Sequence, residues 1–362
     1  MGLTHHSTKK NAIDVGISAP NASVSIIALA GNPNVGKSTI FNALTGMKQH
    51  TGNWPGKTVS NACGYCQSGT QQYRLVDIPG TYSLMAHSAE EEIARNYICF
   101  SHPDAVVVVC DATCLERNLN LVLQTIETGA RVLVCVNLMD EAKRKHITLD
   151  IELLEKRLGV PVVSTVAQRK NTLSALLDRI DTLLTTPIAA TYTVSYAAPI
   201  EDAVAALTPL LDEKVGSALN TRWLALRLLE SDIPLQKEIT AFFGYDLLTD
   251  VAISAAIAEQ RKRLADAGLT GYSLHDSMVS SLVLGAQELC NGVVRQKKHS
   301  KHRNRSTYRP RAHRSQGRLS VNDNVACLCF LANNRGSEHS FTASGKRVVL
   351  DTGSSNRVVY LS

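Results

Sequence analysis

A glycine-rich segment near the amino terminus has the spacing of a phosphate-binding loop. Residues 31–38 read GNPNVGKS, which matches G-x-x-x-x-G-K-[ST], directly after the apolar run SIIALA and before STIFNAL. In this context backbone N–H groups cradle phosphates, Lys37 reaches the β- and γ-phosphates, and Ser38 ligates Mg²⁺. A chance glycine-rich helix cap explains the full pattern poorly. The residues of this loop expected to contact a nucleotide are Asn32, Asn34, Val35, Gly36, Lys37, Ser38 and Thr39.

Two further segments are expected to converge on the same phosphates. In VDIPG, Asp77 ends a predicted strand, where its carboxylate can hold Mg²⁺ through water, and the Gly80 N–H can meet a γ-phosphate. The pattern D-x-x-G is weak alone and gains weight from its order after the loop. Between them, QHTGNWPGKTVSN is glycine-rich with an exposed-looking Trp54, and we expect a mobile loop. Its Gly56 and Thr58 are candidate nucleotide contacts, Thr58 closing on Mg²⁺ and the γ-phosphate in the triphosphate state.

The predicted catalytic residues are Lys37, Thr58 and Gly80, and the predicted Mg²⁺ ligands are Ser38, Thr58 and Asp77.

The segment NLMD supplies a candidate base reader. Asp140 can accept hydrogen bonds from N1–H and the 2-amino group of guanine, whereas adenine offers neither donor there. Asn137 or Asp140 singly would also suit a helix cap, but the pair at a strand end favours guanine. In STVA, which follows the next strand, a backbone N–H of Thr165, Val166 or Ala167 is expected to contact the guanine carbonyl.

These residues need a scaffold that brings strand ends together. Short β-branched runs alternate with helical patterns from Ser23 to about 186, which predicts parallel strands joined by right-handed crossovers in a doubly wound α/β sheet. Ligands of such sheets lie at the carboxyl ends of the strands. The predicted organisation is a flexible leader over 1–23, a G domain over 24–186, a helical domain over 187–290 and a basic tail over 291–362.

The tail differs in composition from the rest of the chain. It holds 14 Lys/Arg against 3 Asp/Glu, whereas 1–290 holds 24 against 29. It lacks periodicity, so we expect it to be disordered, or to be the out-of-frame reading of a disrupted gene, which the nucleotide sequence would test. A solvated arm that binds nucleic acid or anionic lipid is the other interpretation. Aromatic residues are sparse there, so no specific nucleic acid is expected.

The cysteine content and the hydropathy of the sequence indicate the cellular compartment. Nine cysteines without a regular framework, and a start that lacks a secretory h-region, favour a reducing cytoplasm. No apolar run reaches the roughly 18 residues of a membrane span. Cys63 and Cys66 of CGYC lack a second pair and are interpreted as strand residues.

Together the motifs resemble one GTPase family. GNPNVGKSTIFNALTG, TGNWPGKTV, VDIPGTYSL, SAEEEIARNYI and DATCLERNLNLVLQTIE resemble the cytoplasmic G domain of the bacterial ferrous iron transport protein B (FeoB) family. The resemblance covers roughly 24–290, and in that family a helical domain like a guanine-nucleotide-dissociation inhibitor follows. It implies a P-loop GTPase of the Ras-like, TrmE-Era-EngA type that converts GTP to GDP and phosphate with Mg²⁺.

The resemblance also implies a role and partners. It implies regulation of Fe²⁺ uptake through a C-terminal membrane core in the bacterial inner membrane, with this part on the cytoplasmic side and small Feo accessory proteins as partners. The oligomeric state stays open.

Two positions in the loops bear on hydrolysis. Thr81 stands where Ras-like proteins place a water-orienting Gln, which predicts slow hydrolysis or another means of positioning water. Asn34 stands where potassium-activated relatives place a cation ligand, and it equally suits an Asn that satisfies the loop backbone.

The alternative function is a free-standing soluble GTPase switch whose basic tail binds RNA or anionic membrane. Salt-sensitive RNA binding that disappears on deleting 291–362 would favour this alternative.

Overall fold

The computed structural model describes residues 24–46, 49–54, 59–86, 88–186, 192–296, 340–343, 346–351 and 357–361. It divides into two units, Met1–His299 and Ser300–Ser362, which are described separately. The expected leader, most of the basic segment, and the candidate residues Gly56 and Thr58 lie outside the described residues.

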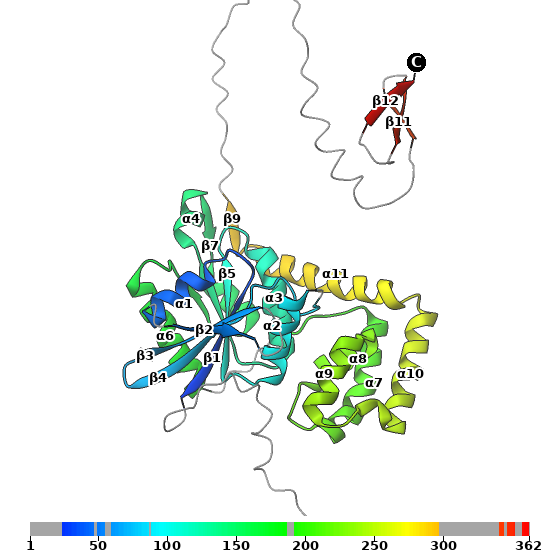
Figure 1. Ribbon diagram of the computed structural model, residues 1–362, viewed down its shortest axis with the longest axis horizontal. Coiled ribbons are helices and arrows are strands. Elements are labelled where there is room, and N and C mark those ends of the chain that lie inside the picture. Colours follow the sequence, from blue (N-terminus) through cyan, green and yellow to red (C-terminus); the bar gives the residue numbers. More distant parts are fainter. Residues whose placement is uncertain are drawn as a thin grey trace, which may run out of the picture. The chain divides into compact units, whose positions relative to one another are not determined.

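A seven-stranded mixed sheet, in the order β2-β3-β4-β1-β5-β6-β8, forms the centre of the first unit (Figure 1). Its strands are β1 (Ser25–Gly31), β2 (Gln49–Asn53), β3 (Ser60–Ser68), β4 (Gln71–Asp77), β5 (Ala105–Asp111), β6 (Val132–Asn137) and β8 (Val162–Ser164). The strands from β4 through β1, β5 and β6 to β8 are all parallel, as the alternating pattern predicted. Their runs of Val, Ile and Leu are buried on both faces, as parallel strands between helical layers require.

The sheet has an antiparallel edge that the alternation of strands and helices did not predict. Strand β3 pairs antiparallel with both β2 and β4. Between β3 and β4 lie only Gly69, which has φ 55°, and Thr70. So short a connection makes a hairpin and cannot make a parallel crossover.

Helices cover both faces of the sheet because successive strand residues point to opposite sides. Ile27 and Leu29 of β1 face a core that also holds residues of α1 (Lys37–Thr45) and α6 (Lys170–Thr185). Ala28 and Ala30 face a second core. That core includes residues of α2 (Ala89–Phe100), α3 (Leu115–Glu127) and α5 (Ile151–Leu158).

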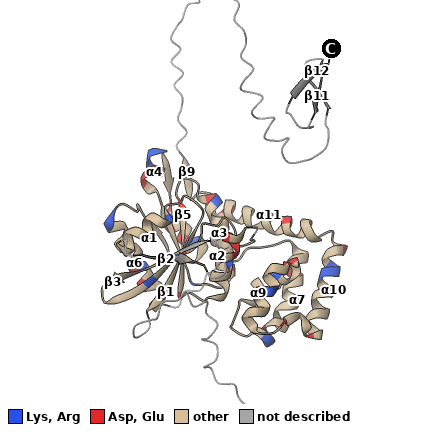
Figure 2. Cartoon of the chain, viewed as in Figure 1, with Lys and Arg blue, Asp and Glu red and all other residues tan. Residues whose placement is uncertain are grey.

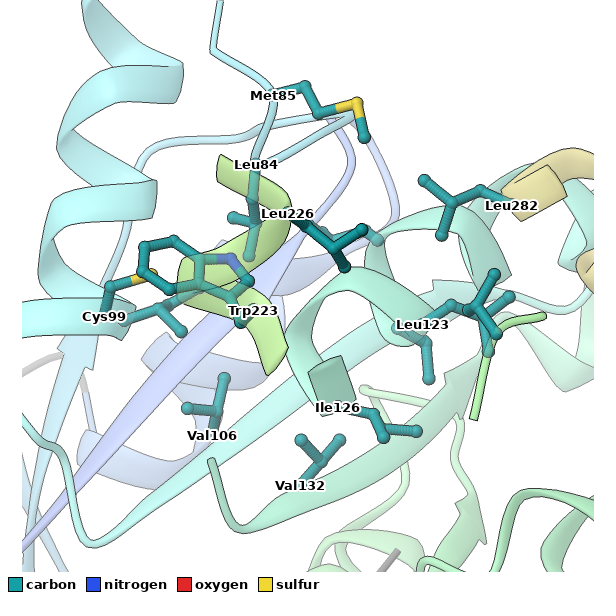
Figure 3. Packing of buried hydrophobic residues seen from close by; sticks show 14 of the residues in the cluster. Leu84, Met85, Cys99, Val106, Leu123, Ile126, Val132, Trp223, Leu226 and Leu282 are labelled. Carbon is teal, nitrogen blue, oxygen red and sulfur yellow. The ribbon is translucent and has the colours of Figure 1, made fainter. Parts of the chain in front are cut away.

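The second core continues without interruption into the helical domain. This domain contains α7 (Ala198–Val215), α8 (Thr221–Glu230), α9 (Ile233–Phe243), the short 3₁₀ helix η2 (Leu247–Thr249), α10 (Val251–Asp266) and α11 (Gly271–Cys290). Figure 3 shows Trp223, Leu226 and Leu282 of this domain in one cluster with Leu123 and Val132 of the sheet domain. The ring of Trp223 packs edge-on against Phe100 at 6.3 Å. The two domains therefore share apolar surface.

Polar contacts also join the domains. The guanidinium of Arg95, only 1% exposed, pairs with Asp232 at 3.2 Å. Glu127 accepts a hydrogen bond from the Tyr196 hydroxyl at 2.8 Å. Burial raises the pKa of the Glu127 carboxyl.

The chain returns to the sheet domain after α11. Arg157 of α5 donates to the carbonyl oxygens of Leu289 and Asn291 at the end of that helix. Strand β9 (Val294–Gln296) then pairs with β7 (Ile147–Leu149), which follows α4 (Met139–Arg144). Ordered structure thus extends six residues past the expected domain end at 290.

Two expectations need correction. Trp54 looked exposed, but it is only 3% exposed and packs against the Tyr97 ring at 5.2 Å, because β2 joins the sheet edge just before it. In the second unit, β10 (Ser340–Ala343), β11 (Lys346–Asp351) and β12 (Arg357–Leu361) form a three-stranded antiparallel sheet. The expectation of a tail without structure did not include this sheet.

The charged residues of the first unit are distributed over its helices and strands (Figure 2). Across the residues that the structure describes, every helix falls short of the length or apolar character that crossing a bilayer demands.

Candidate nucleotide-binding site

The phosphate-loop sequence folds into a tight connection between β1 and α1. A Cβ atom at Gly31 would lie 2.6 Å from the Val109 carbonyl oxygen, so this position requires glycine. Gly36 caps α1 with φ 86°, and Asn34 also has a left-handed conformation with φ 66°. The turn leads directly into α1, whose first-turn N–H groups are suited to bind an anion.

The expected phosphate and Mg²⁺ ligands lie together beside this loop. Strands β1 and β4 are parallel neighbours with Leu29 opposite Asp77, so the carboxylate emerges next to the loop. The Lys37 ammonium, on a side chain only 10% exposed, forms an ion pair with Asp77. Ser38 Oγ donates to the other carboxylate oxygen at 3.2 Å. A hydroxyl and a carboxylate are the oxygen ligands that Mg²⁺ prefers, so the residues present fit this ion.

Gly80 packs closely against the phosphate loop. Ile78 N–H donates to the Leu29 carbonyl at 3.1 Å, and Thr81 N–H donates to the Gly31 carbonyl at 3.1 Å. A Cβ atom at Gly80 would lie 3.3 Å from the Cα atom of Pro33. A larger residue would require Pro33 to shift by a few tenths of an ångström, so close packing favours glycine here without a left-handed φ.

Thr81 is buried, and its hydroxyl forms a hydrogen bond within its own loop. It is 1% exposed, and its hydroxyl donates to the Ser83 carbonyl at 2.7 Å. This hydrogen bond occupies the hydroxyl proton at the position where a Ras-like protein would place its Gln.

Asn137 ties three segments of the site together. Its Nδ2 donates to the Val35 carbonyl of the phosphate loop at 3.0 Å. Its Oδ1 accepts from Thr165 Oγ1 and from the Ala167 N–H, both at 3.2 Å. Asn137 is fully buried, and its contacts lie within the protein. Sequence reasoning assigned this residue to the base and missed the bracing role, which no local pattern reveals.

The segment 165–167 uses its N–H groups inside the protein. Thr165 N–H donates to the Val136 carbonyl at 2.8 Å, Val166 N–H to Thr172 Oγ1 at 3.2 Å, and Ala167 N–H to Asn137. The guanine contact expected here stays a prediction. Thr172, which sequence reasoning missed, also donates to the Val166 carbonyl at 3.0 Å and so holds the turn.

Asp140 lies in the first turn of α4, which the chain enters through Leu138 at φ 61°. Asp140 is thus the second residue of α4 and stands three residues after Asn137 in the sequence.

Three other phosphate-loop candidates differ in exposure. Asn34 and Thr39 are exposed, and Asn32 is 4% exposed. The Oδ1 atom of Asn32 is buried and makes no hydrogen bond to the described residues. It is therefore an acceptor that a donor or a cation can satisfy.

The cysteines of CGYC lie in strand β3, as expected, and both are buried. Burial raises the pKa of the Cys66 thiol to about 12, which keeps it protonated and unreactive.

Comparison with known proteins identifies relatives of both domains. A family model described as ferrous iron transport protein B matches residues 25–180, and one described as the FeoB cytosolic helical domain matches 196–295. The chain is 39% identical over 211 residues to the Fe(2+) transporter FeoB of Escherichia coli K12, covering 57% of this chain and 27% of the relative. It is 37% identical over 244 residues to a fusion of Fe(2+) transport protein A and Fe(2+) transporter FeoB from Porphyromonas gingivalis, covering 65% and 28%.

The chain thus spans little more than a quarter of these relatives.

Solved structures agree with the family models. The GDP form II of the T. maritima FeoB cytosolic domain has a TM-score of 0.63 at 29% identity, covering 75% of this chain and all of that chain. A GDP-bound point mutant of the S. thermophilus FeoB G-domain has a TM-score of 0.66 at 28% identity, with the same coverage.

Proposed function

This chain belongs to the ferrous iron transport protein B family over residues 25–180 and 196–295, and on that premise we propose that it binds GTP and hydrolyses it to GDP and phosphate. The observation that carries the proposal is the convergence of Lys37 and Ser38 on Asp77 beside the phosphate loop. The solved relatives with GDP support the guanine nucleotide.

Phosphate binding is proposed to exchange the partner of Lys37. The Lys37–Asp77 pair keeps a buried ammonium neutralised. A β- or γ-phosphate at the loop is a stronger partner for the ammonium, and its arrival releases the Asp77 carboxylate. Ser38 and Asp77, with Thr58 in the triphosphate state, would hold Mg²⁺. When bound, this ion neutralises charge on the phosphate oxygens.

Hydrolysis is proposed to depend on Gly80, whose N–H donates to the γ-phosphate. Thr81 gives no help with the attacking water, because its hydroxyl donates to Ser83. Slow intrinsic turnover follows, unless another group orients the water. A K⁺ ion held near Asn34 would add charge stabilisation, and K⁺-dependent turnover is the sign of that role.

Base recognition is proposed to rest on Asp140, which follows Asn137 by three residues, and on an N–H of residues 165–167 that exchanges its internal partner for the guanine carbonyl. The bracing fixes where α4 begins relative to the phosphate loop. A fixed distance between phosphate and base sites lets one nucleotide satisfy both.

In the family context we propose that this nucleotide cycle regulates Fe²⁺ uptake. The relatives are named Fe(2+) transporters and are almost four times as long as the matched region. The regulated path is then a membrane-embedded part like theirs, with this chain on the cytoplasmic side of the inner membrane. Small Feo accessory proteins are proposed partners, supported by the relative in which transport protein A is fused to FeoB.

The test of nucleotide choice is Asp140→Asn. A carboxylate accepting from two donors is worth about 3 kcal/mol or more, so GTP affinity should fall about 100-fold. Xanthine nucleotides should gain, because an amide can donate to their 2-oxo group. Titration with fluorescent GDP, competed by GTP and XTP, measures both effects.

The matched control is Glu141→Gln, which removes the neighbouring carboxylate of α4. Glu141 pairs with Arg144 at 3.0 Å, so its loss should leave nucleotide affinity unchanged. Unchanged GTP affinity in Asp140→Asn would refute the assignment of the base reader.

A further inference from the structure

One buried glutamine fastens the loop that follows Gly80 to helix α3. Gln124 is 7% exposed. Its Oε1 accepts hydrogen bonds from Ser83 Oγ at 2.9 Å and from the Leu84 backbone N–H at 2.5 Å. The Leu84 N–H can only donate, so the amide oxygen of Gln124, not its nitrogen, must face the loop. A single oxygen therefore holds two consecutive loop residues.

This contact is the end of a continuous series of hydrogen bonds from the phosphate loop. Thr81 N–H donates to the Gly31 carbonyl at 3.1 Å, and Thr81 Oγ1 donates to the Ser83 carbonyl at 2.7 Å. Ser83 Oγ, which accepts from the Met85 N–H at 3.0 Å, then donates to Gln124. Gly80 immediately precedes Thr81, whose N–H is the first donor of this series. The segment that follows Gly80 is therefore anchored at the phosphate loop through Thr81 and at α3 through Gln124.

Packing against the helical domain holds α3 itself in place. Glu127, three residues after Gln124, accepts from the Tyr196 hydroxyl at 2.8 Å. Leu123 and Ile126 belong to the same core cluster as Leu226 of the helical domain (Figure 3). Gln124 therefore belongs to a helix that contacts with the helical domain hold in place independently of the loop after Gly80.

We propose that Gln124 is a positioning residue for GTP hydrolysis, which holds residues 83–84 so that the Gly80 N–H stays directed at the γ-phosphate. This inference rests on the proposed function and deepens it. GDP lacks the γ-phosphate, so GDP affinity should not depend on Gln124. The rate of GTP hydrolysis should depend on it.

The experiment compares variants of the full chain. Gln124→Met keeps the length of the side chain and removes the acceptor. Thr125→Val is the matched control, because Thr125 is adjacent and fully buried, and its hydroxyl donates to the Leu121 carbonyl within α3 at 2.7 Å. The measurements are kcat and KM for GTP, the Kd of GDP, and the urea midpoint of unfolding.

In Gln124→Met we expect kcat to fall about 30-fold, because two net hydrogen bonds of about 1 kcal/mol each correspond to about this factor. GDP Kd should stay within about twofold, and Thr125→Val should keep the wild-type kcat. An unchanged kcat in Gln124→Met, or an equal loss in Thr125→Val, would overturn the proposal.

A double-mutant cycle with Ser83→Ala separates positioning from general destabilisation. Ser83→Ala removes one of the two donors to Gln124, so it should lower kcat about fivefold or more in the wild-type background, and by clearly less in Gln124→Met, where only the bond from the Met85 N–H is left to lose. Additive effects of the two changes would count against the shared contact. Failure of the wild-type chain to bind GDP or hydrolyse GTP would instead overturn the proposed function, and is distinguishable on that ground.

Discussion

Replacing Asn137 by Ala should destabilise the sheet domain as well as weaken nucleotide binding. The substitution removes three hydrogen bonds, from Asn137 to the Val35 carbonyl and to Asn137 from Thr165 Oγ1 and the Ala167 N–H. Asn137 is fully buried, so water replaces these partners poorly.

The magnitude follows from the bonds and from what they leave behind. Three net hydrogen bonds at about 1 kcal/mol each, plus about 1 kcal/mol for a stranded N–H, give roughly 3–5 kcal/mol of lost stability. For a unit of this size that corresponds to a fall in Tm of about 10 °C. Such a loss is a large fraction of an ordinary unfolding free energy of about 5–15 kcal/mol.

The assay is urea unfolding without nucleotide, followed by GDP titration at a temperature where the variant is folded. Asp140→Asn is the control, because it should lose nucleotide affinity and keep the wild-type urea midpoint. An Asn137→Ala variant as stable as the wild type, with lowered GDP affinity, would refute the bracing role and leave Asn137 as a base contact alone.

Two further predictions concern the interface and the pH profile. Asp232→Asn keeps the cap of α9 but leaves the buried Arg95 without its carboxylate. This substitution should lower the free energy of unfolding by roughly 2–4 kcal/mol, measured with urea. Breaking the exposed Arg263–Glu259 pair should lower it by no more than about 0.5 kcal/mol. Equal losses would contradict the role of the buried Arg95–Asp232 pair at the domain interface. Hydrogen bonds from Arg222 lower the pKa of Glu201, so its contribution is present above the ordinary value of 4.5 and is lost as pH falls through the lower folded value. As pH falls from 4.5 to the lower folded pKa, the urea midpoint of the wild type should therefore fall more steeply than that of Glu201→Gln. Parallel profiles of the two proteins would exclude a contribution of Glu201 to this pH dependence.

Local patterns allowed much of the fold and site to be predicted. The strand, glycine-rich loop and helix around Lys37 depend on residues close in sequence, as do the strand ends at Asp77 and Asn137. The parallel arrangement of β1, β4, β5, β6 and β8 follows from their alternation with helices. Convergence of the motifs on one end of the sheet then follows from topology.

Other features escaped prediction because they depend on which distant surfaces meet. Burial of Trp54 requires Tyr97 and the antiparallel edge, neither of which a glycine-rich segment reveals. The commitment of the Thr81 hydroxyl to Ser83 depends on how the loop after Gly80 turns. The anchoring of that loop by Gln124 joins residues that lie 40 apart in the sequence.

The amino-acid sequence by itself determined the chemistry available: a glycine-rich loop of the phosphate-binding type, a carboxylate proposed to accept from guanine, and an α/β domain followed by helices. Short-range backbone preferences and periodic burial are enough to specify these, since each involves neighbouring residues. Only the tertiary structure decided that Asn137 hydrogen-bonds to both the phosphate loop and residues 165–167, that Lys37 pairs with Asp77, and that α3 carries both the loop anchor and the helical-domain interface. These are long-range hydrogen bonds and packing contacts, and their geometry exists only once segments that are distant in the sequence have packed together.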